Sequence, residues 1–269
     1  MEGGGNGGDA FLEDESTKIF AKKVADHYSA RTNQTLEERE ASPIIHLKKL
    51  NNWIKSVLIQ LYAKRGDAVL DLACGKGGDL IKWDKAKIGY YVGIDIADGS
   101  IEDCRTRYNG DADHHQRRKK FTFPARLLSG DCFEVTNSVD LISRARRALA
   151  NVSSLLRPGG IFIGTMPDAN VIVKKLRAAE GLAFGNSVYW IHFDDEFSEK
   201  KFKSSSPFGI KYKFHLEDAV DCPEWIVPFH VFKSLAEERG QPTEQNRANS
   251  RRDKGKMHLE KEDITFIGS

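Results

Sequence analysis

The fold is decided by residues 69–79, which read Val-Leu-Asp-Leu-Ala-Cys-Gly-Lys-Gly-Gly-Asp. An apolar run ends at Asp71, three glycines follow between residues 75 and 78, and the amphipathic segment 79–83 comes next. A buried strand that leads through a glycine turn into the N-terminus of a helix makes a cleft for a nucleotide-like ligand. The sequence therefore predicts an α/β fold with a ligand site at this turn.

Strands and helices alternate after this turn. The sequence predicts strands at about 68–73, 90–96 and 125–131, with helices near 79–87 and 99–108 between them. Such alternation indicates right-handed crossovers and a parallel sheet.

Further elements are predicted on either side of this core. An apolar stripe before the first strand predicts a helix that packs on the sheet. Its members are Leu47, Leu50, Trp53, Ile54, Val57, Leu58 and Leu61. Other helices are expected at 19–28, 143–156, 170–180 and 228–238, a strand at 161–165, and antiparallel strands at 187–193 and 211–216.

Composition bounds the class of protein. The 269 residues carry 41 basic and 39 acidic side chains, so any surface that binds a polyanion must be local. The basic run 117–120 is interpreted as a solvated surface rather than a binding site. The four cysteines have no paired metal spacing and indicate free thiols in a reducing compartment. No apolar run approaches the roughly 18 residues of a membrane span, and the acidic, glycine-rich N-terminus is unlike a secretory signal.

The spacing of the glycines narrows the choice of ligand. The pattern Ala73-x-Gly75-x-Gly77-Gly78, preceded by Asp71, differs from the G-x-G-x-x-G of dehydrogenases and is typical of S-adenosylmethionine (SAM) sites. The competing interpretation is a purely structural tight turn.

Two further acids favour the SAM interpretation. Asp95 and Asp131 follow the second and third predicted strands, as Asp71 ends the first. Three acids at three consecutive strand ends are not explained by core packing, because unpaired buried carboxylates are costly. In SAM enzymes the first such acid lies near the methionine amine, the second binds the ribose hydroxyls and the third faces the adenine.

The segment Asn51-Asn52-Trp53-Ile54-Lys55 stands within the helix predicted before the first strand. Two successive asparagines are not explained by helix propensity, although an exposed polar turn is an alternative. Lys55 can extend to solvent or contact the carboxylate of the methionine moiety.

Seven motifs along the chain carry a family resemblance. They are His27-Tyr28-x-Ala30-Arg31, the segment 51–56, the segment 71–83, the segment 95–98, the segment 158–165, Phe208-Gly209-x-Lys211-Tyr212 and Val220-Asp221-Cys222-Pro223-Glu224. With these motifs, residues from about 19 to 238 resemble the mRNA cap guanine-N7 methyltransferases, most closely the plant-type members.

The resemblance implies a class I SAM-dependent methyltransferase fold, which is a Rossmann-like three-layer α/β sandwich. It implies transfer of a methyl group from S-adenosyl-L-methionine to N7 of the cap guanine of mRNA. It also implies a nuclear monomer that acts on capped RNA (GpppN ends) with the capping and transcription machinery, without a membrane or a metal.

The resemblance assigns roles residue by residue. The SAM site would be lined by Lys55, Asp71, Ala73, Gly75, Asp95 and Asp131. The cap would be bound by Asn51, Asn52, Lys76, Lys82, Arg107 and Glu224. Among these, the two asparagines would contact the cap nucleotide and the three cations its phosphates, while the Glu224 carboxylate would accept hydrogen bonds from the guanine N1–H and amino groups. No catalytic acid, base or nucleophile is named, because guanine N7 carries a lone pair and no proton.

The chain departs from the family after the third strand. The family has a segment there that supplies the fourth strand and a Gln-Phe…His-Tyr stretch in contact with SAM and guanine. Here only residues 136–143 intervene before the Arg144-Ala145-Arg146-Arg147 run, and 139–142 is at most a stub of that strand. The chain also turns polar after Glu238, where the family continues into its last strands. A truncated form, an alternatively spliced form or a mis-assembled gene would explain both changes.

These departures predict a weakened fold and little methyl transfer, because loss of a central strand leaves backbone N–H and C=O groups of the neighbouring strand without hydrogen-bond partners. The predicted organisation is a disordered tail at 1–16, one methyltransferase domain at 17–239 and a disordered polar tail at 240–269. The alternative function is a catalytically impaired module that binds the cap or SAM. A methyltransferase for small molecules is disfavoured by the Asn-Asn pair and the Pro223-Glu224 motif, and a dehydrogenase by the glycine spacing.

Overall fold

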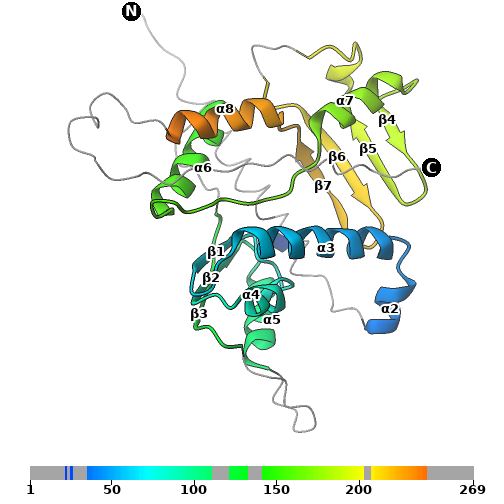
Figure 1. Cartoon of the computed structure of the whole chain (residues 1–269). Coiled ribbons are helices and arrows are strands. Elements are labelled where there is room, and N and C mark those ends of the chain that lie inside the picture. The colour runs from blue at the N-terminus through cyan, green and yellow to red at the C-terminus, as the bar shows by residue number, and fades with distance from the viewer. Residues whose placement is uncertain are drawn as a thin grey trace, which may run out of the picture. The chain divides into compact units, whose positions relative to one another are not determined.

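The computed structural model describes residues 22, 25–26, 35–110, 121–132, 141–202 and 207–240 (Figure 1). The chain divides into two compact units, one of residues 1–41 and 45–137 and the other of residues 42–44 and 138–269. The predicted tail 1–16 and basic run 117–120 lie outside the described residues, as does nearly all of the predicted helix 19–28 and of the tail 240–269. The predicted domain 17–239 contains described residues of both units.

The first unit contains the predicted parallel sheet. Its elements are α2 (Leu36–Ala41), α3 (Ile45–Tyr62), β1 (Ala68–Leu72), α4 (Leu80–Ala86), β2 (Tyr90–Asp95), α5 (Asp98–Asn109) and β3 (Ala125–Ser129). The strands are parallel in the order β1-β2-β3. The strands predicted at 68–73, 90–96 and 125–131 and the helices predicted near 79–87 and 99–108 are present, so the α/β, Rossmann-like character of the fold is confirmed.

Local chemistry sets the ends of these helices. Thr35 and Glu38 form a capping box before α2, in which each backbone N–H donates to the other residue's side chain. Lys87 caps the C-terminus of helix α4, where its backbone is left-handed and its N–H donates to the carbonyl of Asp84. These caps fix the lengths of helices that the apolar pattern places only approximately.

The prediction that the α3 stripe packs on the sheet is wrong for three of its members. Leu58 is buried, but Leu50, Trp53 and Leu61 are 39%, 63% and 67% exposed. Helix α3 packs instead against α4 and α2. The physical reason is area, because a three-stranded sheet cannot cover the apolar side of an 18-residue helix.

Strand β1 has an open edge in the described part of the chain. It pairs with β2 and with no other described strand. The expected strand at 161–165 is wrong, since this segment has no regular structure, and residues 141–142 begin a helix rather than end a stub of the fourth strand. A strand persists only where a neighbour satisfies its backbone groups, so both corrections agree with the loss of the central strand.

The second unit contains an antiparallel sheet and three α-helices among its described residues. Its elements are α6 (Leu141–Leu155), α7 (Ala169–Ala178), β4 (Ala183–Gly185), β5 (Tyr189–Phe193), the 3-10 helix η1 (Asp195–Phe197), β6 (Lys211–Leu216), β7 (Val220–Trp225) and α8 (Phe229–Gly240). The strand order is β4-β5-β6-β7. The predicted antiparallel pair β5–β6 and the three helices are confirmed. Strand β7 was not predicted, and it contains Pro223, which an edge strand tolerates.

One face of this antiparallel sheet is covered by α7. Ile172 and Leu176 of α7 pack against Ile191, Phe193 and Tyr212 of β5 and β6. A second apolar cluster joins α6 to α8 through Leu149, Leu235 and Ala236. The sheet is therefore apolar towards α7, and its alternate residues lie on the opposite face. No helix in the described ranges is long and apolar enough to cross a membrane.

The glycine turn provides a sharp test of the packing in the first unit. Gly77 has φ of +70°, and a Cβ at this position would lie 2.6 Å from Cys104 Sγ and 2.7 Å from Leu80 Cδ1. Cys104 and Leu80 are fully buried and have little room to move. We expect Gly77→Ala to lower the free energy of unfolding by about 2–4 kcal/mol, from backbone strain and overpacking together. Urea unfolding followed by circular dichroism measures the difference.

Gly78→Ala is the matched control. A Cβ at Gly78 meets no heavy atom within 4 Å, and its backbone lies outside the left-handed region. The control is expected to unfold like the wild-type chain. Equal stability of the two variants would contradict the packing described for the turn.

Candidate functional site

The three acids lie at one edge of the parallel sheet. Leu72 of β1 pairs with Ile94 of β2, and Ile94 pairs with Leu128 of β3. Leu72, Ile94 and Leu128 are thus aligned across the three strands. Asp71 directly precedes Leu72, Asp95 directly follows Ile94 and ends β2, and Asp131 follows the end of β3 by two residues. The carboxyl ends of adjacent parallel strands are where open α/β sheets bind their ligands.

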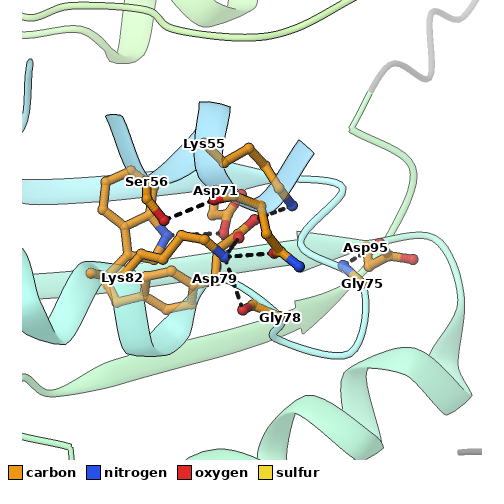
Figure 2. Close-up of polar contacts among 11 residues, drawn as sticks. Lys55, Ser56, Asp71, Gly75, Gly78, Asp79, Lys82 and Asp95 are labelled. Atoms are coloured by element: carbon orange, nitrogen blue, oxygen red, sulfur yellow. Dashed lines mark hydrogen bonds and ion pairs between the residues drawn. The ribbon is translucent and has the colours of Figure 1, made fainter. Parts of the chain in front are cut away.

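The glycine turn is held by the Asp95 carboxylate. Ala73, Gly75 and Gly77 all have positive φ, so the chain reverses sharply between β1 and α4. Asp95 is 8% exposed and accepts a hydrogen bond from the N–H group of Gly75 at 2.8 Å (Figure 2). It also accepts one from the N–H group of Ala97 at 2.9 Å. Each carboxylate oxygen keeps a lone pair after these bonds, so a ribose diol can still be bound.

Asp71 is held by two aromatic side chains. The Tyr91 hydroxyl donates to Asp71 Oδ2 at 2.8 Å, and Trp83 Nε1 donates to the same oxygen at 3.2 Å. Burial raises the pKa of Asp71 although both hydrogen bonds oppose the shift. Neither aromatic residue was named as a site residue from the sequence. The signal available there was a Tyr and a Trp beside the turn, because both residues require polar partners when buried.

Two lysines converge on Asp79 beside the turn. Lys55 Nζ lies 2.7 Å from Asp79 Oδ2, and Lys82 Nζ lies 2.5 Å from Oδ1 (Figure 2). Lys82 also donates to Asn52 Oδ1 at 3.0 Å. Burial raises the pKa of Asp79, but the hydrogen bonds and charges of both lysines outweigh burial and hold that pKa below its usual value.

Three predicted ligands therefore lie together: Lys55, which was predicted to bind SAM, and Asn52 and Lys82, which were predicted to bind the cap. Asp79, which joins the two lysines, was not predicted from the sequence. Two cations around one carboxylate leave one net positive charge at the start of α4. Asn51 is exposed on α3. The signal for Asp79 was its position directly before α4, three residues ahead of Lys82.

The other predicted phosphate ligands lie on α5 and in the turn. Lys76 Nζ is 2.7 Å from Asp103 Oδ2, and Arg107 is exposed in the last turn of α5. Lys76 and Lys82 are therefore held by different acids rather than in one ion-pair network.

Glu224 belongs to the second unit, whereas the other predicted cap ligands belong to the first. It lies on β7 opposite Tyr212 of β6, and the Tyr212 hydroxyl donates to its Oε2 at 3.4 Å. Burial raises the pKa of Glu224 despite this hydrogen bond. Hydrogen bonds from a ligand stabilise the charged form of a carboxylate whose pKa burial has raised. A ligand edge with two N–H donors, such as that of guanine, can supply two such bonds.

The four cysteines are free thiols, as predicted. Burial raises the pKa of Cys132, whose Sγ lies 3.8 Å from the Ile94 carbonyl oxygen. Within the described ranges, no group of three or more His, Cys, Asp or Glu side chains is placed to hold a metal ion.

Comparison with known proteins decides the family. The family model for the mRNA (guanine-N(7))-methyltransferase domain matches residues 11–142 and 137–242. The chain belongs to the mRNA cap guanine-N7 methyltransferase family. It is 78% identical to mRNA cap guanine-N(7) methyltransferase 1 of Arabidopsis thaliana over 253 residues, which take in 86% of this chain and 68% of the relative. It is 68% identical to the protein of the same name from Oryza sativa subsp. japonica over 257 residues, 88% of this chain and 69% of the relative. The plant-type resemblance is therefore confirmed.

A fungal cap methyltransferase shows how far the likeness extends. The mRNA cap guanine-N(7) methyltransferase of Schizosaccharomyces pombe is 41% identical over 243 residues, 80% of this chain and 64% of the relative.

The matches also bear on the expected missing segment. The family match comes in two pieces that overlap at residues 137–142, beside the place where the sequence predicts the loss. The Arabidopsis alignment of 253 positions is longer than 86% of a 269-residue chain, so the relative has positions without a counterpart here.

Tyr91→Phe tests the support of Asp71. The substitution leaves a buried carboxylate without its shorter hydrogen bond and should lower the free energy of unfolding by about 1–3 kcal/mol at neutral pH. Tyr90→Phe is the matched control, because Tyr90 is the preceding residue of β2 and is 40% exposed. Chemical unfolding of both variants measures the effect, and equal stability would show that the Tyr91 hydroxyl does not support Asp71.

Asp79→Asn tests the lysine bridge and its pH dependence. The pKa of Asp79 is lower in the folded than in the unfolded chain, so its stabilising contribution is present above 3.8 and is lost as the pH falls through the folded pKa. We expect the variant to be less stable by about 1–3 kcal/mol at neutral pH. The gap between variant and wild type should narrow below pH 3.8.

Glu102→Gln is the control for the bridge, because it removes an exposed ion pair with Arg105 and should change stability little. Urea unfolding across the pH series gives the three curves. A gap that stays constant with pH would contradict the bridge.

Proposed function

We propose that this chain binds SAM at the glycine turn of the first unit and transfers its methyl group to N7 of the guanine in an mRNA 5′ cap. The observation that carries the proposal is the buried Asp95 carboxylate, which ties Gly75 and Ala97 to the end of β2 beside Asp71. Membership of the cap methyltransferase family supplies the acceptor, since the curated relatives carry that activity in their names.

The roles proposed for the SAM ligands are those that the family resemblance implies, and several of these residues lie at or beside the strand ends. Asp95 would accept the ribose hydroxyls, and Asp131 would face the adenine at the end of the neighbouring strand. Asp71 would lie near the methionine amine, with Lys55 near the methionine carboxylate. The positive φ of Ala73 and Gly75 bends the backbone so that it can pass close to the ligand.

The cap ligands divide by chemistry. Asn51 and Asn52 would contact the cap nucleotide, and Glu224 would pair with the N1–H and amino groups of its guanine. Lys82 lies within the Asp79 bridge, while Lys76 and Arg107 carry positive charge at the turn and on α5. Phosphate oxygens of the cap triphosphate would compete with the Asp79 carboxylate for Lys82 and with the Asp103 carboxylate for Lys76.

The reaction needs alignment rather than proton transfer. The lone pair of guanine N7 attacks the sulfonium methyl, so a C–N bond forms as the C–S bond breaks and the electron pair stays on sulfur. Positive charge moves from sulfur to the guanine ring, and no proton is exchanged. The protein's contribution is to hold the two ligands in line and to place carboxylates around the moving charge.

A second function, a cap- or SAM-binding module with little transfer, is favoured by the open edge of β1 and the exposed Trp53 and Leu61 of α3. Both features leave the first unit short of packing, so we propose that methyl transfer is slower than in the plant relatives. We further propose a nuclear monomer that works beside the capping and transcription machinery and uses no metal.

Asp95→Asn tests the SAM site. Loss of the charged acceptor should weaken binding of labelled SAM by about 10–100-fold, because hydrogen bonds to a charged group contribute about 1.5–3 kcal/mol. Glu102→Gln, which changes the same charge at an exposed position of α5, should bind SAM like the wild type. Equilibrium dialysis measures both, and equal affinities would remove Asp95 from the site.

Methyl transfer is measured with labelled SAM and GpppA-capped RNA, followed by digestion to identify m7GpppA. The proposal expects this product at a lower rate than the Arabidopsis relative forms it. Binding of SAM and of a cap analogue without product would establish the binding module instead, and a rate equal to the relative's would contradict the slow transfer.

A further inference from the structure

The antiparallel sheet of the second unit has a second face, opposite the one covered by α7 (Figure 1). Alternation along β5, β6 and β7 places on this outer face the residues Trp190, His192, Lys211, Lys213, His215, Asp221, Pro223 and Trp225. These residues are here called the outer sheet face. It is rich in aromatic and basic side chains, whereas the opposite face carries the apolar residues that pack against α7.

A stack of flat side chains lies at the centre of the outer sheet face. The rings of Trp190 and His215 are 5.2 Å apart and nearly parallel, with 9° between their planes. Lys213 Nζ lies 5.2 Å from the centroid of the Trp190 ring. The residue paired with Trp190 on β4 is Gly185, where a Cβ would lie 2.5 Å from Trp190 Cα. The β4 partner therefore offers no side chain to cover the indole.

The outer sheet face carries two lysines and two histidines, and two acids pair with members of this set. Asp221 lies 3.4 Å from Lys213 Nζ and 3.6 Å from His215 Nδ1, and Glu217, the residue that follows β6, lies 3.4 Å from His215 Nε2. Lys211 and His192 have no acidic partner within ion-pair distance among the residues that the structure describes. Trp225 remains 36% exposed at the edge strand, where it pairs in register with Lys211.

We propose that the outer sheet face binds single-stranded RNA, namely the nucleotides that follow the cap of the substrate. Nucleobases stack on exposed aromatic rings, and the backbone phosphates follow the lysines between them. The inference rests on the proposed function for the identity of the substrate as a capped RNA. An acidic peptide would use the lysines but would gain little from two indoles and an imidazole.

The test measures binding of an uncapped RNA to the full 269-residue chain. The probe is a fluorescein-labelled, single-stranded, 5′-hydroxyl RNA of about 12 nucleotides, within the size range of such sites, and fluorescence anisotropy is the readout. Neither cap nor SAM is present, so the measurement is independent of the methyl-transfer site.

Two variants of the outer sheet face are compared with a matched control. Trp225→Ala removes an edge indole and should weaken RNA binding about tenfold. Lys211→Ala with Lys213→Ala should reduce the steepness of the dependence of log affinity on log salt by about 1.4, since each phosphate contact on a single strand contributes about 0.7. The control, Lys201→Ala with Lys233→Ala, removes the same charge from exposed positions outside the sheet and should bind RNA like the wild type.

The outcomes separate the inference from the proposed function. Urea unfolding of each variant and unchanged binding of a cap analogue show that the fold and cap site are intact. RNA affinities of the sheet variants equal to the control's would overturn the inference, and so would displacement of the RNA by poly-glutamate at equal charge concentration. If the chain binds SAM and the cap analogue but no RNA, only the inference about the outer sheet face is overturned. If it binds RNA but not SAM, only the proposed function is overturned.

Discussion

The first unit depends on the Asp95 carboxylate. It is buried, and its two oxygens accept hydrogen bonds from the N–H groups of Gly75 and Ala97. One of these amides belongs to the turn after β1 and the other to the start of α5, so a single side chain fixes the relation of two adjacent strand ends. A buried carboxylate is tolerated only when it is satisfied in this way, which makes the turn and the acid mutually dependent.

Around this contact, each site group has its own support. Tyr91 and Trp83 hold Asp71, and Lys55 and Lys82 hold Asp79. Burial raises the pKa of Asp71 against its two neutral donors, whereas at Asp79 the two lysines outweigh burial and lower the pKa. The proposed division of labour follows, with the carboxylates facing a cationic methyl donor and the lysines near an anionic cap.

Much of this arrangement could be predicted from the sequence. The glycine spacing and the acids at 71, 95 and 131 identified the strand ends. This was possible because apolar periodicity and residue spacing can be recognised within one segment of the chain. Asp79, Tyr91 and Trp83 were missed as site residues because their roles arise from contacts between segments. The α3 stripe and the expected strand at 161–165 failed for one shared reason. Both patterns assume a neighbour that the described residues do not provide, and an apolar residue or a strand without a partner does not behave as its pattern predicts.

Among the described residues β1 has no neighbour besides β2, and the Arabidopsis relative has positions without a counterpart in this chain. The most direct measurement is made on a chimera in which the segment of the Arabidopsis relative is inserted between Val135 and Ser143. Its free energy of unfolding and its rate of cap methylation are compared with those of the present chain under the same conditions. A neighbour for β1 should raise both quantities together. A chimera with unchanged stability and rate would contradict the claim that the missing segment limits this protein.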